Sequence, residues 1–184
     1  MKNYYLLIII AALLCSCSNK ENEQKHSNQL IFQLDSTESN SGIQKLQASS
    51  LEQNISVNGK NYILFINRTP SDSLPSVKSE TGIFYDNKIV VKIIDSTNRK
   101  NIFSKTFTKK TFQEYLNDDF KKNAILEGVV FDSEKSKKDK NITLAASISF
   151  PLSDLYIPFT IKIVNGLIAN ISKDDNFYDI PEQE

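Results

Sequence analysis

Apolar and polar residues alternate over most of the chain from about residue 43 onward. In the run 88–95, Ile89, Val91 and Ile93 fall on one side and Lys92 falls on the other. Successive side chains of a strand point to opposite faces, so this pattern predicts strands that bury one face. The runs with strand character are 51–57, 61–67, 88–95, 101–107, 125–132, 141–150, 156–164 and 167–172.

Two Asn-Gly pairs mark tight turns within this pattern. Asn58-Gly59 and Asn165-Gly166 each stand between two of the apolar runs. Asn and Gly tolerate the positive φ of a type I′ turn, which joins neighbouring antiparallel strands. We therefore predict a mainly β fold, an antiparallel β-meander of about eight strands that forms either a sandwich or a partly open barrel.

One segment has helical periodicity instead. Thr111 and Glu114 have the spacing of a capping box, in which each side chain satisfies a backbone N–H of the first turn. Four apolar residues then recur at helical spacing: Phe112, Tyr115, Leu116 and Phe120. We expect one α-helix near 112–122, packed on the sheet by this aromatic stripe.

The beginning of the chain follows a third pattern. Lys2 precedes an unbroken apolar run over 4–14, which is typical of a secretory signal and too short to span a bilayer. The run ends in Leu14-Cys15-Ser16-Cys17, which resembles the lipobox of bacterial lipoproteins: Leu three residues before the modified cysteine and a small residue directly before it. The resemblance implies cleavage after Ser16 and lipidation of Cys17, so we expect a partnership with a membrane through that lipid.

These patterns predict four segments. They are a lipoprotein signal peptide over 1–16, the lipidated cysteine with a flexible polar tether over 17–42, a single β-rich domain over 43–175 and a polar tail over 176–184. In other bacteria a serine after the lipidated cysteine favours the outer membrane. Ser18 therefore indicates an outer-membrane lipoprotein of the cell envelope, and the periplasmic and surface-exposed leaflets both stay open.

Composition narrows the possible chemistry. The 22 Lys and Arg residues balance the 22 Asp and Glu residues, so no nucleic-acid partner is expected. The one histidine, His26, lies in the predicted tether, and both cysteines lie at or before position 17. This excludes a His-dependent triad and a His- or Cys-ligated zinc from the predicted domain, and we expect no cofactor, metal or catalytic residue. A lysine cluster over 135–140 is interpreted as a solvated hairpin tip.

The carboxylate pairs Asp118/Asp119 and Asp174/Asp175 offer little for acid–base catalysis. Adjacent helical residues do not face each other, whereas paired catalytic carboxylates converge from separate elements. Asp86 with Asp72 could supply oxygen ligands to calcium, but a loop with calcium-binding spacing is missing and turns explain these residues better.

Two proline-containing connections are candidate binding loops, since long ordered loops often hold binding residues. The alternative is that both are rigid connections whose prolines end strand pairing, and this alternative is favoured. The residues of interest are Asp72, Leu74, Pro75, Tyr85 and Asn87 in the first loop, and Asp154 and Tyr156 in the second.

The same regions carry an ordered series of motifs. They are Asp72-Ser73-Leu74-Pro75 with Val77-Lys78, Tyr85 with Asn87, Phe103 with Thr106-Phe107-Thr108-Lys109, Ile125-Leu126-Glu127-Gly128, and Ala145-Ala146-Ser147 continuing to Pro158. The series covers most of 60–172 and resembles an uncharacterised Bacteroidota lipoprotein family, a domain-of-unknown-function family of small secreted envelope proteins. The resemblance implies an envelope location and a folded domain, and it supplies no catalytic residues.

Three Asp-Ser-apolar or Asp-Ser-Thr sites resemble the acceptor motif of Bacteroidota O-glycosylation. Their serines are Ser36, Ser73 and Ser96, all in predicted tether or turns, where a glycan can be accommodated.

Three functional classes remain. The chain combines anchor, tether and domain without a catalytic constellation, which favours a non-enzymatic binding or structural module with an envelope protein as partner. A lipocalin-like carrier of a small apolar ligand would require a closed apolar cavity. An enzyme that uses carboxylates alone is the least favoured class.

Overall fold

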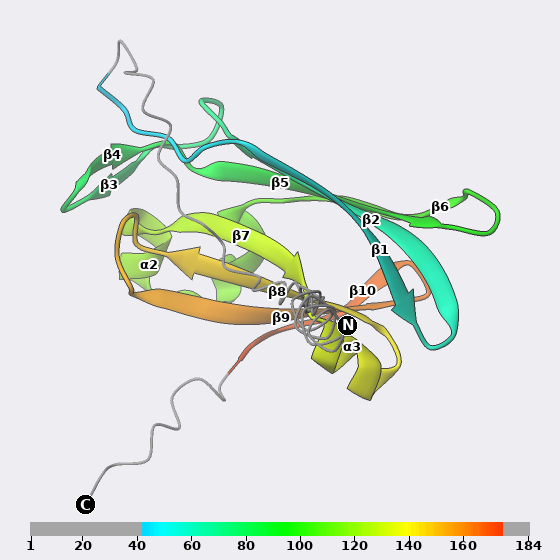
Figure 1. Ribbon diagram of the computed structural model, residues 1–184. Helices are drawn as coiled ribbons and strands as arrows, with labels where there is room; N and C mark the ends of the chain where they lie inside the picture. Colours follow the sequence, from blue (N-terminus) through cyan, green and yellow to red (C-terminus); the bar gives the residue numbers. More distant parts are fainter. Residues whose placement is uncertain (1–41, 175–184) are drawn as a thin grey trace, which may run out of the picture.

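The computed structural model describes residues 42–174, which form two facing four-stranded sheets with a small hairpin and three short helices at their ends (Figure 1). The predictions for the signal peptide, Cys17, the tether up to residue 41, Ser36 and the tail over 176–184 lie outside the described residues. The strands are β1 (Ser49–Val57), β2 (Lys60–Pro70), β3 (Val77–Ser79), β4 (Gly82–Phe84), β5 (Asn87–Asp95), β6 (Asn101–Phe107), β7 (Ile125–Phe131), β8 (Ile142–Ser149), β9 (Tyr156–Val164) and β10 (Leu167–Lys173).

Each large sheet is an antiparallel meander. The first has the order β1-β2-β5-β6 and the second β10-β9-β8-β7, while β3 and β4 form a separate hairpin between β2 and β5. Both predicted Asn-Gly turns are present, with positive φ at Asn58, Gly59, Asn165 and Gly166. All eight long strands correspond to predicted runs. The alternation is clearest in β5 and β9, which bury one face, whereas β7 is buried on both faces and β10 has no fully buried residue.

The two sheets share one hydrophobic core. Leu64 and Val91 of the first sheet and Leu144 and Ile161 of the second are fully buried members of the same cluster. The mainly β, antiparallel prediction is confirmed. Of the two predicted alternatives the structure has the sandwich, because the eight long strands form two separate sheets that pack on one shared core.

The helix expected near 112–122 is divided in two. A 3₁₀ helix, η1 (Lys109–Tyr115), ends at Leu116, and α2 (Asp118–Asn123) begins after Asn117, whose side chain accepts the backbone N–H of Phe120. Asn117 is a strong N-cap, so it starts a new helix where the periodicity alone suggested continuation. The aromatic stripe packs as predicted: the Phe112 and Phe159 ring centroids are 4.8 Å apart.

The lysine cluster is not a hairpin tip, and this prediction was wrong. Residues Ser133–Asp139 form helix α3, capped by the Asp132 carboxylate, which accepts the backbone N–H of Lys135. An acidic first turn and lysines in the last turn complement the helix dipole, and a turn assignment overlooked that order. Within residues 42–174 none of the helices has the length and apolar character needed to cross a membrane.

Candidate functional site

The β3–β4 hairpin forms one wall of a groove at the end of the sandwich. The first described residues hold it in place: the Gln44 N–H donates to the Ile83 carbonyl at 2.8 Å, and the Tyr85 N–H donates to the Gln44 carbonyl at 2.9 Å. The Gln44 side chain also donates to the Thr81 carbonyl at 2.9 Å. Gly82 has φ +135°, a conformation that side chains disfavour. A Cβ there would also lie 2.2 Å from the side-chain nitrogen of Gln44, so glycine leaves room for the Gln44 side chain beside the hairpin.

The β8–β9 loop, residues 150–155, forms the opposite wall. Its backbone is closed on itself, because the Phe150 N–H donates to the Leu155 carbonyl at 3.0 Å and the Ser153 N–H donates to the Phe150 carbonyl at 3.2 Å. Leu152 has φ +57°, a left-handed conformation that is unfavourable for a branched side chain. The leucines of this loop nevertheless face solvent, with 43% of Leu152 and 64% of Leu155 exposed.

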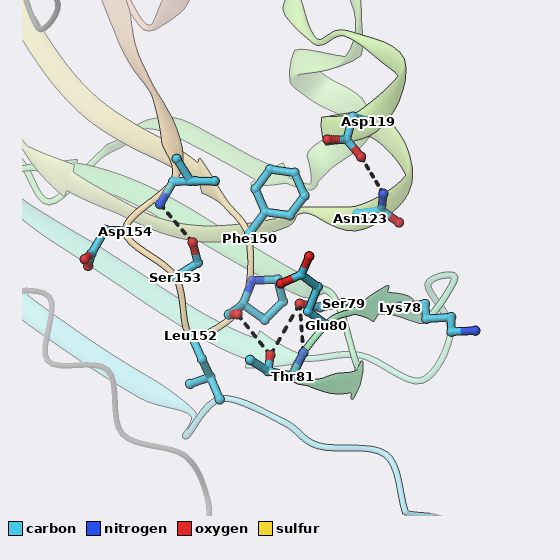
Figure 2. Close-up of a pocket in the computed structure, with 12 residues that line it drawn as sticks. Lys78, Ser79, Glu80, Thr81, Asp119, Asn123, Phe150, Leu152, Ser153 and Asp154 are labelled. Carbon is cyan, nitrogen blue, oxygen red and sulfur yellow. Dashed lines mark hydrogen bonds between the residues drawn. The ribbon is translucent and has the colours of Figure 1, made fainter.

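Contacts between elements fix the two walls relative to each other. The Thr81 hydroxyl donates to the Pro151 carbonyl at 3.2 Å, which links the hairpin to the loop. Phe120 of α2 packs against Phe150, with ring centroids 4.6 Å apart. Figure 2 shows the hairpin, the loop and α2 around the groove, which is therefore built by segments far apart in the sequence.

The groove has a volume of about 810 Å³ and a mixed lining of apolar and acidic side chains. Its lining residues include three carboxylates, those of Glu80, Asp119 and Asp154, and one ammonium group, that of Lys78. In Figure 2 the side chains of Lys78 and Asp154 both extend away from Phe150, on opposite sides. The excess of negative charge therefore rests on the number of lining groups, three carboxylates against one ammonium group. The other lining residues are Ser79, Thr81, Asn123, Phe150, Pro151, Leu152, Ser153 and Leu155.

Of the seven predicted loop residues, Asp154 alone lines this groove. The exposed Asp72 and Pro75 and the half-buried Leu74 lie in the β2–β3 connection, Tyr85 follows β4, and Tyr156 begins β9. Asn87 is fully buried in β5, where its amide donates to the Leu126 carbonyl at 2.9 Å. Asn87 therefore joins the two sheets and is not accessible to a ligand.

The glycosylation candidates differ in their surroundings. Ser73 is exposed, but its hydroxyl accepts the Lys88 ammonium at 2.6 Å. Ser96 is half-buried in the β5–β6 turn, and its backbone N–H donates to the Asn61 carbonyl. O-glycosylation stays a prediction at both positions.

The carboxylate pairs have local partners. Asp118 lies 3.7 Å from the Lys121 ammonium, Asp119 accepts the Asn123 amide at 2.6 Å, and Asp174 is paired with Lys135. Asp175 lies outside the described residues. Within residues 42–174 there is no group of three or more His, Cys, Asp or Glu side chains placed to hold a metal ion.

A buried ionic cluster lies where the two sheets meet. The Asp86 carboxylate accepts the backbone N–H groups of Asn87 at 2.7 Å and Leu126 at 2.9 Å, and it lies 3.8 Å from the Lys109 ammonium. Lys109 also donates to the Ala124 carbonyl at 2.6 Å. These groups satisfy backbone atoms at a junction, which is a structural task.

Arg68 and Glu127 form a second buried group of charges. The Arg68 guanidinium donates to the carbonyls of Glu127 at 2.9 Å and Gln47 at 3.0 Å, and the Ser147 hydroxyl donates to the Glu127 carboxylate at 3.2 Å. Burial raises the pKa values of Glu127 and Asp86 and lowers those of Lys109 and Arg68. Opposite charges and hydrogen bonds oppose each shift only in part.

Comparison with known proteins gives a family without an assigned activity. Residues 29–169 match a domain of unknown function, DUF4738. The chain belongs to the DUF4738 family. The predicted resemblance to an uncharacterised domain-of-unknown-function family is thus confirmed, and no curated protein matches the chain.

Several groove residues of this DUF4738 domain were missed by sequence reasoning. Glu80 and Thr81 lie in a polar turn between Val77 and Ile83. Ser79-Glu80-Thr81-Gly82 is a recognisable hairpin signal, but it lies inside the first of the two connections that we predicted to be loops. Leu152 and Leu155 lie in the second of the predicted loops, but an apolar residue is usually expected to be buried, so the sequence did not predict that both leucines are exposed. For Asp119 and Asn123 the sequence predicted a position in or at the end of a helix and gave no indication that they line a groove.

Proposed function

We propose that this DUF4738 protein is a lipid-anchored, non-enzymatic binding module of the cell envelope. Its partner is an envelope protein that places an extended segment with basic and apolar side chains in the groove beside the β3–β4 hairpin. The observation that carries this proposal is the joint exposure of Leu152 and Leu155 within a rim of three carboxylates. Exposed apolar groups within a polar rim mark interaction sites.

Charge decides which kind of segment fits. Glu80, Asp119 and Asp154 give the groove an excess of negative charge over Lys78. A partner with lysines or arginines would meet a complementary potential, whereas an acidic partner would be repelled. The leucines then supply the apolar area that a charged rim alone does not provide.

The anchor follows from the Leu14-Cys15-Ser16-Cys17 motif. We propose that lipidated Cys17 holds the protein at the outer membrane, with Ser18 favouring that location. Acyl chains contribute about 0.8 kcal/mol for each buried CH₂, and stable anchoring takes more than one chain. A lipidated cysteine would supply several chains at a single residue.

A carrier of apolar ligands is less well supported. The space between the sheets is filled by fully buried side chains, including Phe107, Phe112 and Phe159. A carrier needs that space for its ligand. The buried charges of Asp86 and Lys109 hold backbone groups at the sheet junction. This structural role explains why they are buried, without any role in binding or catalysis.

Site-specific photo-crosslinking tests the groove. A benzophenone side chain at Leu155, introduced in native cells, should capture one envelope protein through a peptide rich in Lys or Arg and apolar residues. The same group at exposed Thr106, on β6, is the position control. Charge reversal by Glu80→Lys with Asp154→Lys should weaken capture by about tenfold, since like charges would then oppose the partner.

Glu52→Lys with Glu114→Lys makes the same charge change at exposed positions outside the groove. This pair should leave capture unchanged. Equal capture from Leu155 and Thr106, or equal losses in both charge-reversed proteins, would contradict the proposal. The anchor is tested separately: Cys17→Ser should move the protein from the membrane to the soluble fraction, and continued membrane association would reject lipidation.

A further inference from the structure

A second concave site lies at the opposite end of the sandwich. It is a cleft of about 420 Å³ where the β1–β2, β5–β6 and β9–β10 turns meet the segment between α3 and β8. β2 begins at this cleft with Lys60 and ends at Pro70, ahead of the hairpin that lines the groove. Figure 1 shows these turns and the β3–β4 hairpin at the two ends of the molecule.

Both Asn-Gly turns identified in the sequence build this cleft. Asn58 lines it from the first turn, and Asn165 and Gly166 line it from the second. A Cβ on Gly166 would lie 2.2 Å from the Ile102 carbonyl oxygen, so the β9–β10 turn packs directly on β6. The cleft therefore joins the two sheets and has walls that are fixed by backbone contact.

The cleft has an excess of positive charge. Lys60, Lys100 and Lys140 line it together with one carboxylate, that of Asp95. One Asp95 oxygen accepts the backbone N–H groups of Thr97 and Asn98, at 2.8 and 3.3 Å. In the part of the chain that the structure describes, none of the three lysine ammonium groups has a hydrogen-bond or ion-pair partner. Other lysines, such as Lys135 and Lys162, are paired with carboxylates.

Neutral hydrogen-bonding groups lie between these charges. Asn58, Asn165 and Tyr62 are among the lining residues, and their side chains carry two amides and one hydroxyl. The Tyr62 hydroxyl is protonated at neutral pH, as in any tyrosine, and can donate a hydrogen bond. Burial, assisted by the charge of Asp95, raises its pKa further above the ordinary value. Amide and hydroxyl groups both donate and accept hydrogen bonds, so they can pair with the hydroxyls of a sugar.

We propose that this cleft binds a phosphate-bearing sugar. Lys60, Lys100 and Lys140 hold the phosphate, because ammonium groups form charge-assisted hydrogen bonds with its oxygens. Asn58 and Asn165 contact the sugar hydroxyls and set the orientation. The cleft volume falls within the range of small-molecule sites. The ligand is either a soluble sugar phosphate or the phosphorylated sugar headgroup of a glycolipid.

NMR titration of the full chain carrying Cys17→Ser, in which no acyl chain contributes, tests this site. Glucose 6-phosphate should cause saturable shifts of the Gly59 and Gly166 amide signals, inorganic phosphate should bind more weakly, and glucose alone should have no effect at equal concentration. The triple variant Lys60→Gln, Lys100→Gln, Lys140→Gln should lose about tenfold or more in affinity. Lys92→Gln, Lys110→Gln, Lys122→Gln removes the same charge at exposed positions outside the cleft and should keep the affinity within about twofold.

Absence of saturable binding, or an equal loss in both triple variants, would overturn the proposal. Equal affinity for phosphate and glucose 6-phosphate would overturn the assignment of a sugar. Phosphatidylcholine vesicles with and without monophosphoryl lipid A separate the two sources. Lipid A-dependent binding that the cleft variant loses would assign a glycolipid headgroup, whereas glucose 6-phosphate binding without vesicle binding would assign a soluble ligand.

Discussion

The carboxylate of Asp86 accepts the backbone N–H of Leu126 at 2.9 Å, although 40 positions separate the two residues. Leu126 lies in β7 of one sheet, and Asp86 directly precedes β5 of the other. The neighbouring Asn87 amide donates to the carbonyl of the same Leu126 at 2.9 Å. Both backbone groups of one β7 residue are therefore satisfied by side chains at the start of β5. This reciprocal pair sets the position of one sheet relative to the other.

Asp86→Ala should destabilise the protein strongly. It removes the acceptor of two buried N–H groups and leaves the Lys109 ammonium without its carboxylate. Breaking a buried pair on one side costs about 3–5 kcal/mol, and we expect a loss of this order in the free energy of unfolding from urea titration. Asp72→Ala, at an exposed turn position, should change it by less than about 0.5 kcal/mol. Similar values for the two variants would mean that the junction does not depend on Asp86.

The stability of the protein should respond to the charge of Glu127. Burial raises the pKa of Glu127 in the folded state, so the native protein binds the proton more tightly than the unfolded chain does. The ionised form therefore costs stability above the raised pKa, and this cost disappears as the pH falls toward the ordinary value for glutamate. Glu127→Gln mimics the protonated form. Its stability relative to wild type should be higher at about pH 7 than at about pH 4, and a difference that is constant with pH would contradict the assignment.

The two Asn-Gly turns should tolerate alanine unequally. Gly59 and Gly166 have nearly the same φ, +74° and +76°, but open space surrounds Gly59 and the Ile102 carbonyl lies 2.2 Å from a Cβ on Gly166. Gly59→Ala should cost about 1 kcal/mol for the left-handed conformation alone. Gly166→Ala adds a backbone clash and should cost about 2 kcal/mol more, measured by thermal unfolding. Equal costs would show that the β9–β10 turn moves away from β6 freely.

Leu152→Asn should separate stability from binding. Asn adopts the left-handed region more easily than Leu, so relief at φ +57° should raise the free energy of unfolding by up to about 1 kcal/mol. The same change removes an exposed apolar group from the groove and should reduce crosslinking from Leu155 several-fold. Leu155→Asn is the control, because it removes a leucine without a positive φ and should leave stability within about 0.5 kcal/mol. A loss of stability in Leu152→Asn would contradict the claim of strain.

Strands were predictable from this sequence because they obey a local rule. Ile89, Val91 and Ile93 share one face with Lys88 and Lys92 on the other, and the strand β5 forms over this run. The short strands β3 and β4 do not obey it, since three residues are too few to display a period. Their position depends on Gln44, which lies far away in the sequence.

The candidate sites were less predictable for a related reason. Asp154 could be selected as a loop residue, but Glu80 and Asp119 reach the same groove from a hairpin and a helix. The cleft likewise gathers Lys60, Lys100 and Lys140 from three connections. A balanced net charge gives no indication of such local separation, because the acidic groove and the basic cleft cancel in the sum.

The attachment of Gln44 to β4 has a mechanical consequence. A pull on the N-terminal part of the chain is transmitted first to the two backbone hydrogen bonds of Gln44, at 2.8 and 2.9 Å, and through them to the β3–β4 hairpin. The hairpin is one wall of the groove, and the core of the sandwich lies behind it in the path of the force. Tension would therefore deform the groove before it reached the large sheets, so a partner in the groove and a pull at Gln44 would act on the same few hydrogen bonds.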